Sequence, residues 1–290
     1  MNARKITALL FLFSLLSASA DTLTFSAMGC GPYNADSEKA IPRFLKEMKA
    51  EGKSEFVVHL GDIVTGADAK LGKLKESHYS RIRDWFTAGG VPSYIVLGDN
   101  EWNDSLDPAE ARGRWDKHLL NLDRRFEKPW ETINQVERPE NFAFVHKGVL
   151  VIGINLVGGR IHDEREWRTR FSQDLDWIGR LFKSQKDNVR AAVVLCQANP
   201  IGFGKKEAAV KKSFGTFVDP FGKLAADFEK PVLFLHADGH KWINDKPWKA
   251  AQNVTRVQLD LIASKFPPLE VTVLEKPEKG SLFAFDRRLP

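Results

Sequence analysis

The stretch Val96-Leu97-Gly98-Asp99-Asn100-Glu101-Trp102 joins an apolar run to a cluster of polar side chains. Residues 91–97 have the composition of a buried strand, and Gly98 and Asp99 end that strand in a turn. The same transition occurs earlier, where the apolar residues 56–60 end at Gly61-Asp62. Because ligands in open α/β sheets bind beyond the carboxyl ends of strands, these turns indicate a functional site at one sheet edge.

Three further predicted strands end in the same way. They are residues 22–27, 189–195 and 231–235, and they lead into Gly29-Cys30-Gly31-Pro32-Tyr33, Cys196-Gln197-Ala198-Asn199 and His236-Ala237-Asp238-Gly239-His240. If the five polar clusters meet at one edge, their oxygen and imidazole groups suit one or two divalent metal ions. A metal pair of this kind activates water and stabilises the entering and leaving oxygens of a phosphoryl displacement.

The remaining periodicity predicts alternating helices and strands. Helices are expected near residues 37–49, 77–86, 108–126 and 165–182, and a hairpin is expected to join residues 141–145 to 149–155 across Lys147-Gly148. Strand patterns at residues 254–261, 269–274 and 282–285 close the chain. This order predicts an α/β fold with layered sheets, and residues 21–290 are expected to form one domain.

The first twenty residues have the pattern of a secretory signal peptide. Arg4 and Lys5 precede the mostly apolar residues 6–16, and Ala18-Ser19-Ala20 is a small-residue cleavage site. The alternative, a membrane anchor, needs about 20 apolar residues, which is more than this run contains. We therefore expect cleavage after Ala20 and a secreted or periplasmic mature protein with no membrane span.

Charge gives little support to a nucleic-acid partner. The chain has 43 Lys and Arg against 38 Asp and Glu, a formal net charge of +5. No long basic tract accompanies this small excess, so a nucleic-acid partner is not expected.

The ordered motifs resemble those of the calcineurin-like metallophosphoesterases over nearly the whole mature chain. Residues 57–62, 96–102 and 235–240 carry the resemblance, and the pattern is similar to that of an exported bacterial subgroup with Gly-Asp-Asn-Glu-Trp and His-x-Asp-x-His motifs. The resemblance implies a four-layer α/β/β/α sandwich of two mixed sheets flanked by helices. It also implies metal-dependent hydrolysis of a small phosphomonoester or phosphodiester.

The resemblance assigns roles to individual positions. Asp62 matches the bridging metal ligand, and Asn100 occupies the place of the catalytic histidine unless the register slips and makes Asn100 a ligand. The other implied metal-site positions are Asp99, Asp238, His240, His236, Cys30 and Gln197. For His236 a strand-end packing role is an equal alternative. The expected cofactor is one or two ions of Mn, Zn or Fe.

Four residues depart from the family pattern in a way that weakens the site: Cys30, Pro32, Asn100 and Gln197 stand in place of Asp, His, His and His. Cys30 replaces a carboxylate, Gln197 replaces a ligand histidine, and Asn100 cannot donate a proton as imidazolium does. Cys30 is either buried and inert, a soft metal ligand, or disulfide-bonded to Cys196; a thiol-based function is a weaker idea. The leading hypothesis is an exported metal-dependent phosphoesterase, and the alternative is a catalytically silent binding protein on the same fold.

The roles of other polar residues have alternative interpretations. Arg160 and Arg165 follow Gly158-Gly159 and are candidates to bind a substrate phosphate, although a solvated loop is the favoured interpretation. His59 lies inside an apolar strand, where a core histidine is expected.

Overall fold

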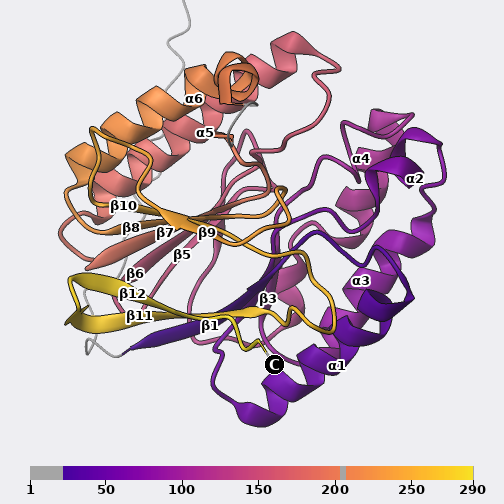
Figure 1. The fold of residues 1–290 in the computed structure, drawn as a ribbon, viewed down its shortest axis with the longest axis horizontal. Helices are drawn as coiled ribbons and strands as arrows, with labels where there is room; N and C mark the ends of the chain where they lie inside the picture. Colours follow the sequence, from indigo (N-terminus) through magenta and orange to yellow (C-terminus); the bar gives the residue numbers. More distant parts are fainter. Residues whose placement is uncertain (1–21, 203–206, 290) are drawn as a thin grey trace, which may run out of the picture.

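The computed structural model describes residues 22–202 and 207–289. These residues form two mixed β-sheets stacked on each other, with helices on the outer face of each sheet (Figure 1). The α/β/β/α sandwich implied by the resemblance is therefore confirmed. The expected signal peptide lies outside the described residues, and the single-domain organisation stays a prediction.

The first sheet carries the amino-terminal part of the site. Its strand order is β12-β11-β1-β2-β3. β1 runs parallel to β2 and β2 to β3, whereas β11 pairs antiparallel with β1. Since helices cover one face and the second sheet the other, its inner strands β1, β2 and β3 are almost completely buried. The strands are β1 (Leu23–Met28), β2 (Val57–His59), β3 (Ser93–Ile95), β11 (Leu269–Glu278) and β12 (Ser281–Asp286).

The second sheet carries the carboxyl-terminal part of the site. Its order is β4-β5-β6-β7-β8-β10-β9, and β6, β7, β8 and β10 are mutually parallel. The carboxyl ends of these parallel strands lie at one edge. The strands are β4 (Ile133–Asn134), β5 (Phe142–His146), β6 (Val149–Gly153), β7 (Ala191–Cys196), β8 (Val232–His236), β9 (Ile243–Asp245) and β10 (Val254–Gln258).

The hairpin expected at Lys147-Gly148 joins β5 to β6. The two strands pair antiparallel, with His146 opposite Val149. Lys147 and Gly148 have φ angles of 47° and 66°. Two consecutive positive φ angles are typical of the type I′ turn, whose twist matches that of the strands it connects.

Two groups of helices cover the sheets. Figure 1 shows α1–α4 beside the first sheet and α5 and α6 on the second. Within residues 22–202 and 207–289, no helix combines the length and apolarity needed to span a membrane. The helices are α1 (Ala35–Glu51), α2 (Gly66–Lys70), α3 (Glu76–Gly89), α4 (Pro108–His118), the 3-10 helix η1 (Leu122–Arg125), α5 (Glu164–Gln185) and α6 (Glu207–Phe228).

Two helical assignments differ from expectation. The helix expected over residues 108–126 ends at His118, because Asn121 takes a left-handed φ of 55° and a 3-10 turn follows. α6 has no counterpart in the sequence prediction, since Pro220 and two glycines interrupt its pattern. Its buried side chains nevertheless recur at helical spacing: Phe214, Phe217, Phe221, Ala225 and Phe228.

A buried polar network joins α5 to the end of β6. Asn141 Nδ2 donates to Asp174 Oδ1 at 2.7 Å, and Asn141 Oδ1 accepts from the Asn155 backbone N–H at 2.7 Å. Arg170 donates to the Asn155 carbonyl at 3.0 Å. The network therefore positions the segment that runs from β6 toward Gly158. Asp174 is fully buried, and burial raises its pKa from 3.8 to about 7.

Asp174→Asn is expected to flatten the pH dependence of the unfolding free energy. Because the pKa of Asp174 is raised in the folded protein, the folded state retains a proton that the unfolded chain loses between about pH 4 and pH 7. This contribution is complete at low pH and is lost as the pH rises through that window. Across that window, the unfolding free energy of the wild type should fall by on the order of a few kcal/mol more than that of the variant.

Denaturant titrations at pH 5 and pH 8 measure this difference. Asp176→Asn, on the exposed side of the same helix, is the matched control. Parallel pH profiles for wild type and Asp174→Asn would contradict the assignment.

Candidate functional site

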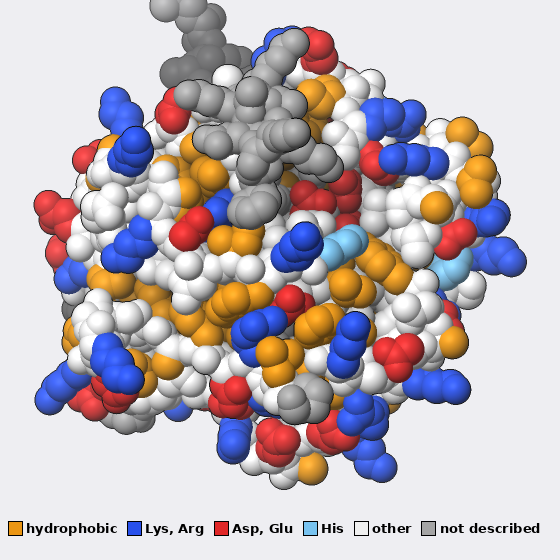
Figure 2. All heavy atoms as spheres, viewed as in Figure 1, with side chains coloured by type: hydrophobic (Ala, Val, Ile, Leu, Met, Phe, Trp, Pro, Cys, Tyr) orange, Lys and Arg blue, Asp and Glu red, His pale blue; other side chains and the backbone are white. Residues whose placement is uncertain are grey.

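The site lies where the parallel strands of both sheets end. Asp62 follows β2, Asp99 follows β3 and Gln197 follows β7. These residues come from both sheets, and their side chains are hydrogen-bonded to one another. Figure 2 shows acidic side chains gathered in a hollow of the molecular face, with basic and histidine side chains at its margin.

Asp62 is the centre of the cluster and is 2% exposed. Its Oδ2 accepts hydrogen bonds from Tyr33 OH at 3.2 Å, Gln197 Nε2 at 3.2 Å and the Cys30 thiol at 3.7 Å. Its Oδ1 accepts from the Asn100 backbone N–H at 3.3 Å. The carboxylate is thus fixed by donors from four separate residues.

The backbone around Asp62 is unusually close to the next strand end. Asp62 has a φ of 64° and Gly61 a φ of 74°, both in the left-handed region that favours glycine. A Cβ on Gly61 would lie 2.7 Å from backbone atoms of Gly98. Glycine at this position therefore permits the ends of β2 and β3 to approach each other.

Glu101 joins these two strand ends. Its carboxylate accepts from the backbone N–H groups of Gly98 at 2.7 Å, Asp62 at 3.1 Å and Ile63 at 3.1 Å. The side chain is completely buried, and burial raises its pKa to about 7 although the N–H donors oppose the shift. Glu101 is a structural support of the site that the sequence analysis did not identify.

Gln197 bridges Asp62 and Asp99. Its Nε2 donates to Asp99 Oδ1 at 2.9 Å as well as to Asp62, and its Oε1 accepts from the Gly158 N–H at 2.8 Å. A backbone N–H on the oxygen determines which end of the amide faces the carboxylates, because a reversed amide would place two donors together.

The carboxylates carry no ion-pair partner. Among the described residues, no ion pair within 4.0 Å includes Asp62, Asp99 or Glu101. Burial, and then the nearby charge of Glu101, raises the pKa of Asp62 to about 7. Burial and the charge of Asp62 likewise raise the pKa of Asp99. Buried carboxylates are normally paired with a cationic side chain or coordinate a metal ion. By that standard, this cluster lacks a compensating positive charge.

The cysteines are both buried free thiols, so the disulfide alternative is not the arrangement in this structure. Cys30 Sγ donates to Asp62 and accepts from the Asp238 N–H at 3.2 Å. Burial raises the pKa of the Cys30 thiol, which disfavours the thiolate that metals bind. Cys196 contacts the Ala198 carbonyl at 3.6 Å and does not contact Cys30.

The three remaining candidate ligands lie in different surroundings. Asp238 adjoins the cluster through the Cys30 contact. His240 is exposed at its margin, and the centre of its ring lies 5.7 Å from the centre of the Tyr33 ring. His236 is completely buried beside Phe234, and its Nδ1 bonds to the Ala237 carbonyl at 3.0 Å. No hydrogen bond among the described residues links His236 to the carboxylates.

The two arginine candidates lie in different surroundings. The Arg160 guanidinium donates to the carbonyls of Asn103 at 3.1 Å and Ser105 at 2.8 Å. It therefore fastens the loop after β3 to the loop after β6. Arg165 is exposed in the first turn of α5. Their role in binding phosphate stays a prediction.

Tyr33 lies in the site although the sequence analysis gave it no role. Its half-buried hydroxyl donates to Asp62 and accepts from Asn100 Nδ2 at 3.3 Å. The same Asn100 amide group also donates to the Val64 carbonyl at 3.0 Å. The only sequence signal for Tyr33 was its position at the end of the Gly-Cys-Gly-Pro-Tyr turn.

The oxygen atoms of the site suit a cation as ligands. They do not form a complete set of charged ligands around one position. Among the described residues, no three His, Cys, Asp or Glu side chains are arranged to hold a metal ion. Oxygens of Asp99, Asp238 and Gln197 nevertheless converge on Gly158, lying 3.2, 3.4 and 3.7 Å from the position that a Cβ there would take. Oxygen ligands of this kind fit a hard divalent ion that keeps several waters.

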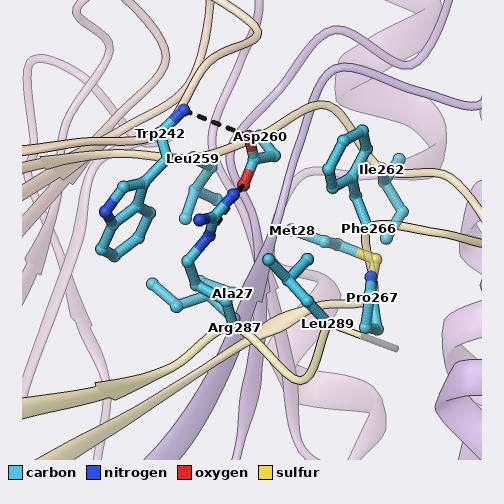
Figure 3. A pocket seen from close by; sticks show the side chains of 11 residues that line it. Ala27, Met28, Trp242, Leu259, Asp260, Ile262, Phe266, Pro267, Arg287 and Leu289 are labelled. Atoms are coloured by element: carbon cyan, nitrogen blue, oxygen red, sulfur yellow. Dashed lines mark hydrogen bonds and ion pairs between the residues drawn. The ribbon is translucent and has the colours of Figure 1, made fainter.

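A separate small pocket lies near the carboxyl terminus. Its two charged side chains, Arg287 and Asp260, pair with each other at 2.7 Å, and Asp260 also accepts from the Trp242 N–H (Figure 3). The Arg287 guanidinium lies 5.2 Å from the centre of a Trp242 ring. Because its polar groups are satisfied internally, we assign this pocket a packing role.

The two stacked sheets and the acidic site at their strand ends are features of the metallophosphoesterase class. This chain belongs to the calcineurin-like phosphoesterase family, whose sequence profile matches residues 34–222. Membership of the family implies use of divalent metal ions.

Two solved structures share the fold. A dimetal phosphatase from Danio rerio is 12% identical, with 86% of this chain and 92% of that chain covered and a TM-score of 0.55. GAP50, the anchor in the inner membrane complex of Plasmodium, is 11% identical, with 92% and 88% covered and a TM-score of 0.53. No curated protein matches the sequence.

Glu101→Gln is expected to destabilise the protein by about 3 kcal/mol. The amide would keep one accepting oxygen but would turn an NH₂ group toward backbone N–H donors. Denaturant unfolding at pH 8 measures the loss, and Glu110→Gln is the control because Glu110 makes an exposed pair with Arg114. Equal effects of the two substitutions would show that Glu101 does not support the strand ends.

Proposed function

We propose that this protein hydrolyses small phosphoesters with the help of a divalent cation bound at the acidic strand ends. The observation that carries the proposal is the burial of Asp62 and Asp99 without an ion-pair partner among the described residues. Charged groups in such surroundings require a compensating charge. Family membership supports a phosphoester as the substrate.

The bound cation would activate water and stabilise the phosphoryl oxygens. Asp99 and Asp238 supply the oxygens that face Gly158, while Cys30, Tyr33 and Gln197 orient Asp62. These contacts place the charged groups before a substrate arrives, which is the condition for electrostatic catalysis.

Asn100 limits the chemistry at the leaving group. Its amide has no titratable proton, and its Nδ2 already donates to Tyr33 and Val64. An ester whose leaving group needs no protonation should therefore react faster than an alkyl ester. Aryl phosphates are accordingly the first substrates to test.

Asp99→Ala is expected to lower hydrolysis of p-nitrophenyl phosphate and bis(p-nitrophenyl) phosphate by about a hundredfold or more. The variant removes both carboxylate oxygens that contact the cluster. Release of p-nitrophenol by the mature protein, with Mg²⁺ or Mn²⁺ added after chelator treatment, provides the measurement. Asp176→Ala, on the exposed face of α5, is the control with the same change of side chain.

Hydrolysis that persists at the wild-type rate in Asp99→Ala, or in chelator, would contradict a cation-dependent reaction at these residues. Circular dichroism of both variants separates loss of chemistry from loss of folding.

A second candidate is a catalytically silent binding protein on the same fold. Its support is the substitution of Asn100, Cys30 and Gln197 at family positions, with all three side chains hydrogen-bonded within the site. GAP50 is described as an anchor, which makes a docking role reasonable for a chain of this fold. Absence of both cation binding and turnover would favour this candidate.

We also propose export to the periplasm or the medium, on the basis of residues 1–20. The expected product of cleavage begins at Asp21. Fractionation of expressing cells and mass spectrometry of the purified amino terminus test this. A protein that retains Met1 or Arg4 in the cytoplasmic fraction would contradict it.

A further inference from the structure

The Gln197 carboxamide divides the acidic cluster into two unequal halves. Its Nε2 lies between Asp62 Oδ2 and Asp99 Oδ1, whereas its Oε1 is on the side of the Gly158 N–H. Gln197 is completely buried. The amide therefore presents donors to one half and an oxygen to the other.

In the first half, hydrogen-bond donors surround the carboxylate that two metal ions would share. Asp62 Oδ2 receives the Cys30 thiol, the Tyr33 hydroxyl and the Gln197 NH₂ group. The partially positive NH₂ group lies between Asp62 and Asp99, where it takes over part of the role of a bridging cation. A cation entering this half would have to displace these donors.

In the second half, oxygens converge instead. Asp99 Oδ2, Asp238 Oδ2 and Gln197 Oε1 all face Gly158. An oxygen already accepting one backbone hydrogen bond retains a second lone pair for a cation. Two carboxylates and an amide oxygen form a hard ligand set, which suits Mg²⁺ or Mn²⁺ better than a thiophilic ion.

We propose that the protein binds one hard divalent cation, at Asp99 and Asp238 beside Gly158, and that the Gln197 amide replaces the second cation of a dimetal site. The proposal rests on the proposed function for the site's use of a cation, but it concerns stoichiometry and ion type. It differs from the dimetal arrangement named for the Danio rerio structure.

Calorimetric titration of the chelator-treated mature protein with Mn²⁺, together with elemental analysis, tests the stoichiometry. The wild type is expected to bind about one equivalent of Mn²⁺, because only one half of the cluster offers free oxygen ligands. The double variant Cys30→Asp with Gln197→His restores an anionic oxygen and an imidazole, and it is expected to bind about two equivalents.

Gly158→Ala tests the position of the ion without changing a ligand. Gly158 does not have a positive φ, so alanine suits its backbone, but the added Cβ would lie 3.2 Å from Asp99 Oδ2, a tight contact, and 3.4 Å from Asp238 Oδ2, in the space where the ion would bind. Mn²⁺ affinity is expected to fall by at least about tenfold. Gly113→Ala is the control, since a Cβ there meets nothing within 4 Å.

Two equivalents in the wild type, none at all, or unchanged affinity in Gly158→Ala would each overturn the proposal. One equivalent without phosphoester hydrolysis would uphold it while contradicting the proposed function. If the double variant fails to fold, the wild-type stoichiometry and Gly158→Ala still decide the question.

Discussion

The contact between the Glu101 carboxylate and three backbone N–H groups is the interaction on which the site depends. It closes the gap between the ends of β2 and β3, and both of these ends carry an acidic residue of the cluster. Without it, the turns that carry Asp62 and Asp99 would lose two of the hydrogen bonds that join them, those from the Asp62 and Ile63 N–H groups. A carboxylate is suited to this task because it accepts several N–H groups at once.

Bringing acidic groups together at a sheet edge costs electrostatic free energy, and the structure offsets part of it with neutral donors. The thiol of Cys30, the phenol of Tyr33 and the amide of Gln197 all point hydrogens at Asp62. None of the three brings a full positive charge. The resulting surplus of negative charge is the physical reason for connecting this site with cations.

The sequence was informative about strand ends and less so about side-chain direction. Apolar runs followed by Gly-Asp predicted where Asp62 and Asp99 lie relative to the sheet, since the direction of parallel strands fixes which ends meet. The orientation of the Gln197 amide depends on one backbone N–H from a distant segment, and no local pattern records it. Likewise, an arginine after two glycines gives no indication that its guanidinium binds loop carbonyls. The sequence did not predict α6, because Pro220 interrupts the helical pattern that its buried phenylalanines form.

The Arg160 guanidinium has a further consequence. It links the loop after β3 to its own loop after β6, and the neighbouring Gly158 and Gly159 adjoin Asp99 of the acidic cluster. The two halves of the sandwich are therefore tied together at their rim, and large hinge-like opening is disfavoured. The space available to a ligand beside this link is then fixed before the ligand binds. We therefore expect the protein to select ligands by their size and not by closing around them.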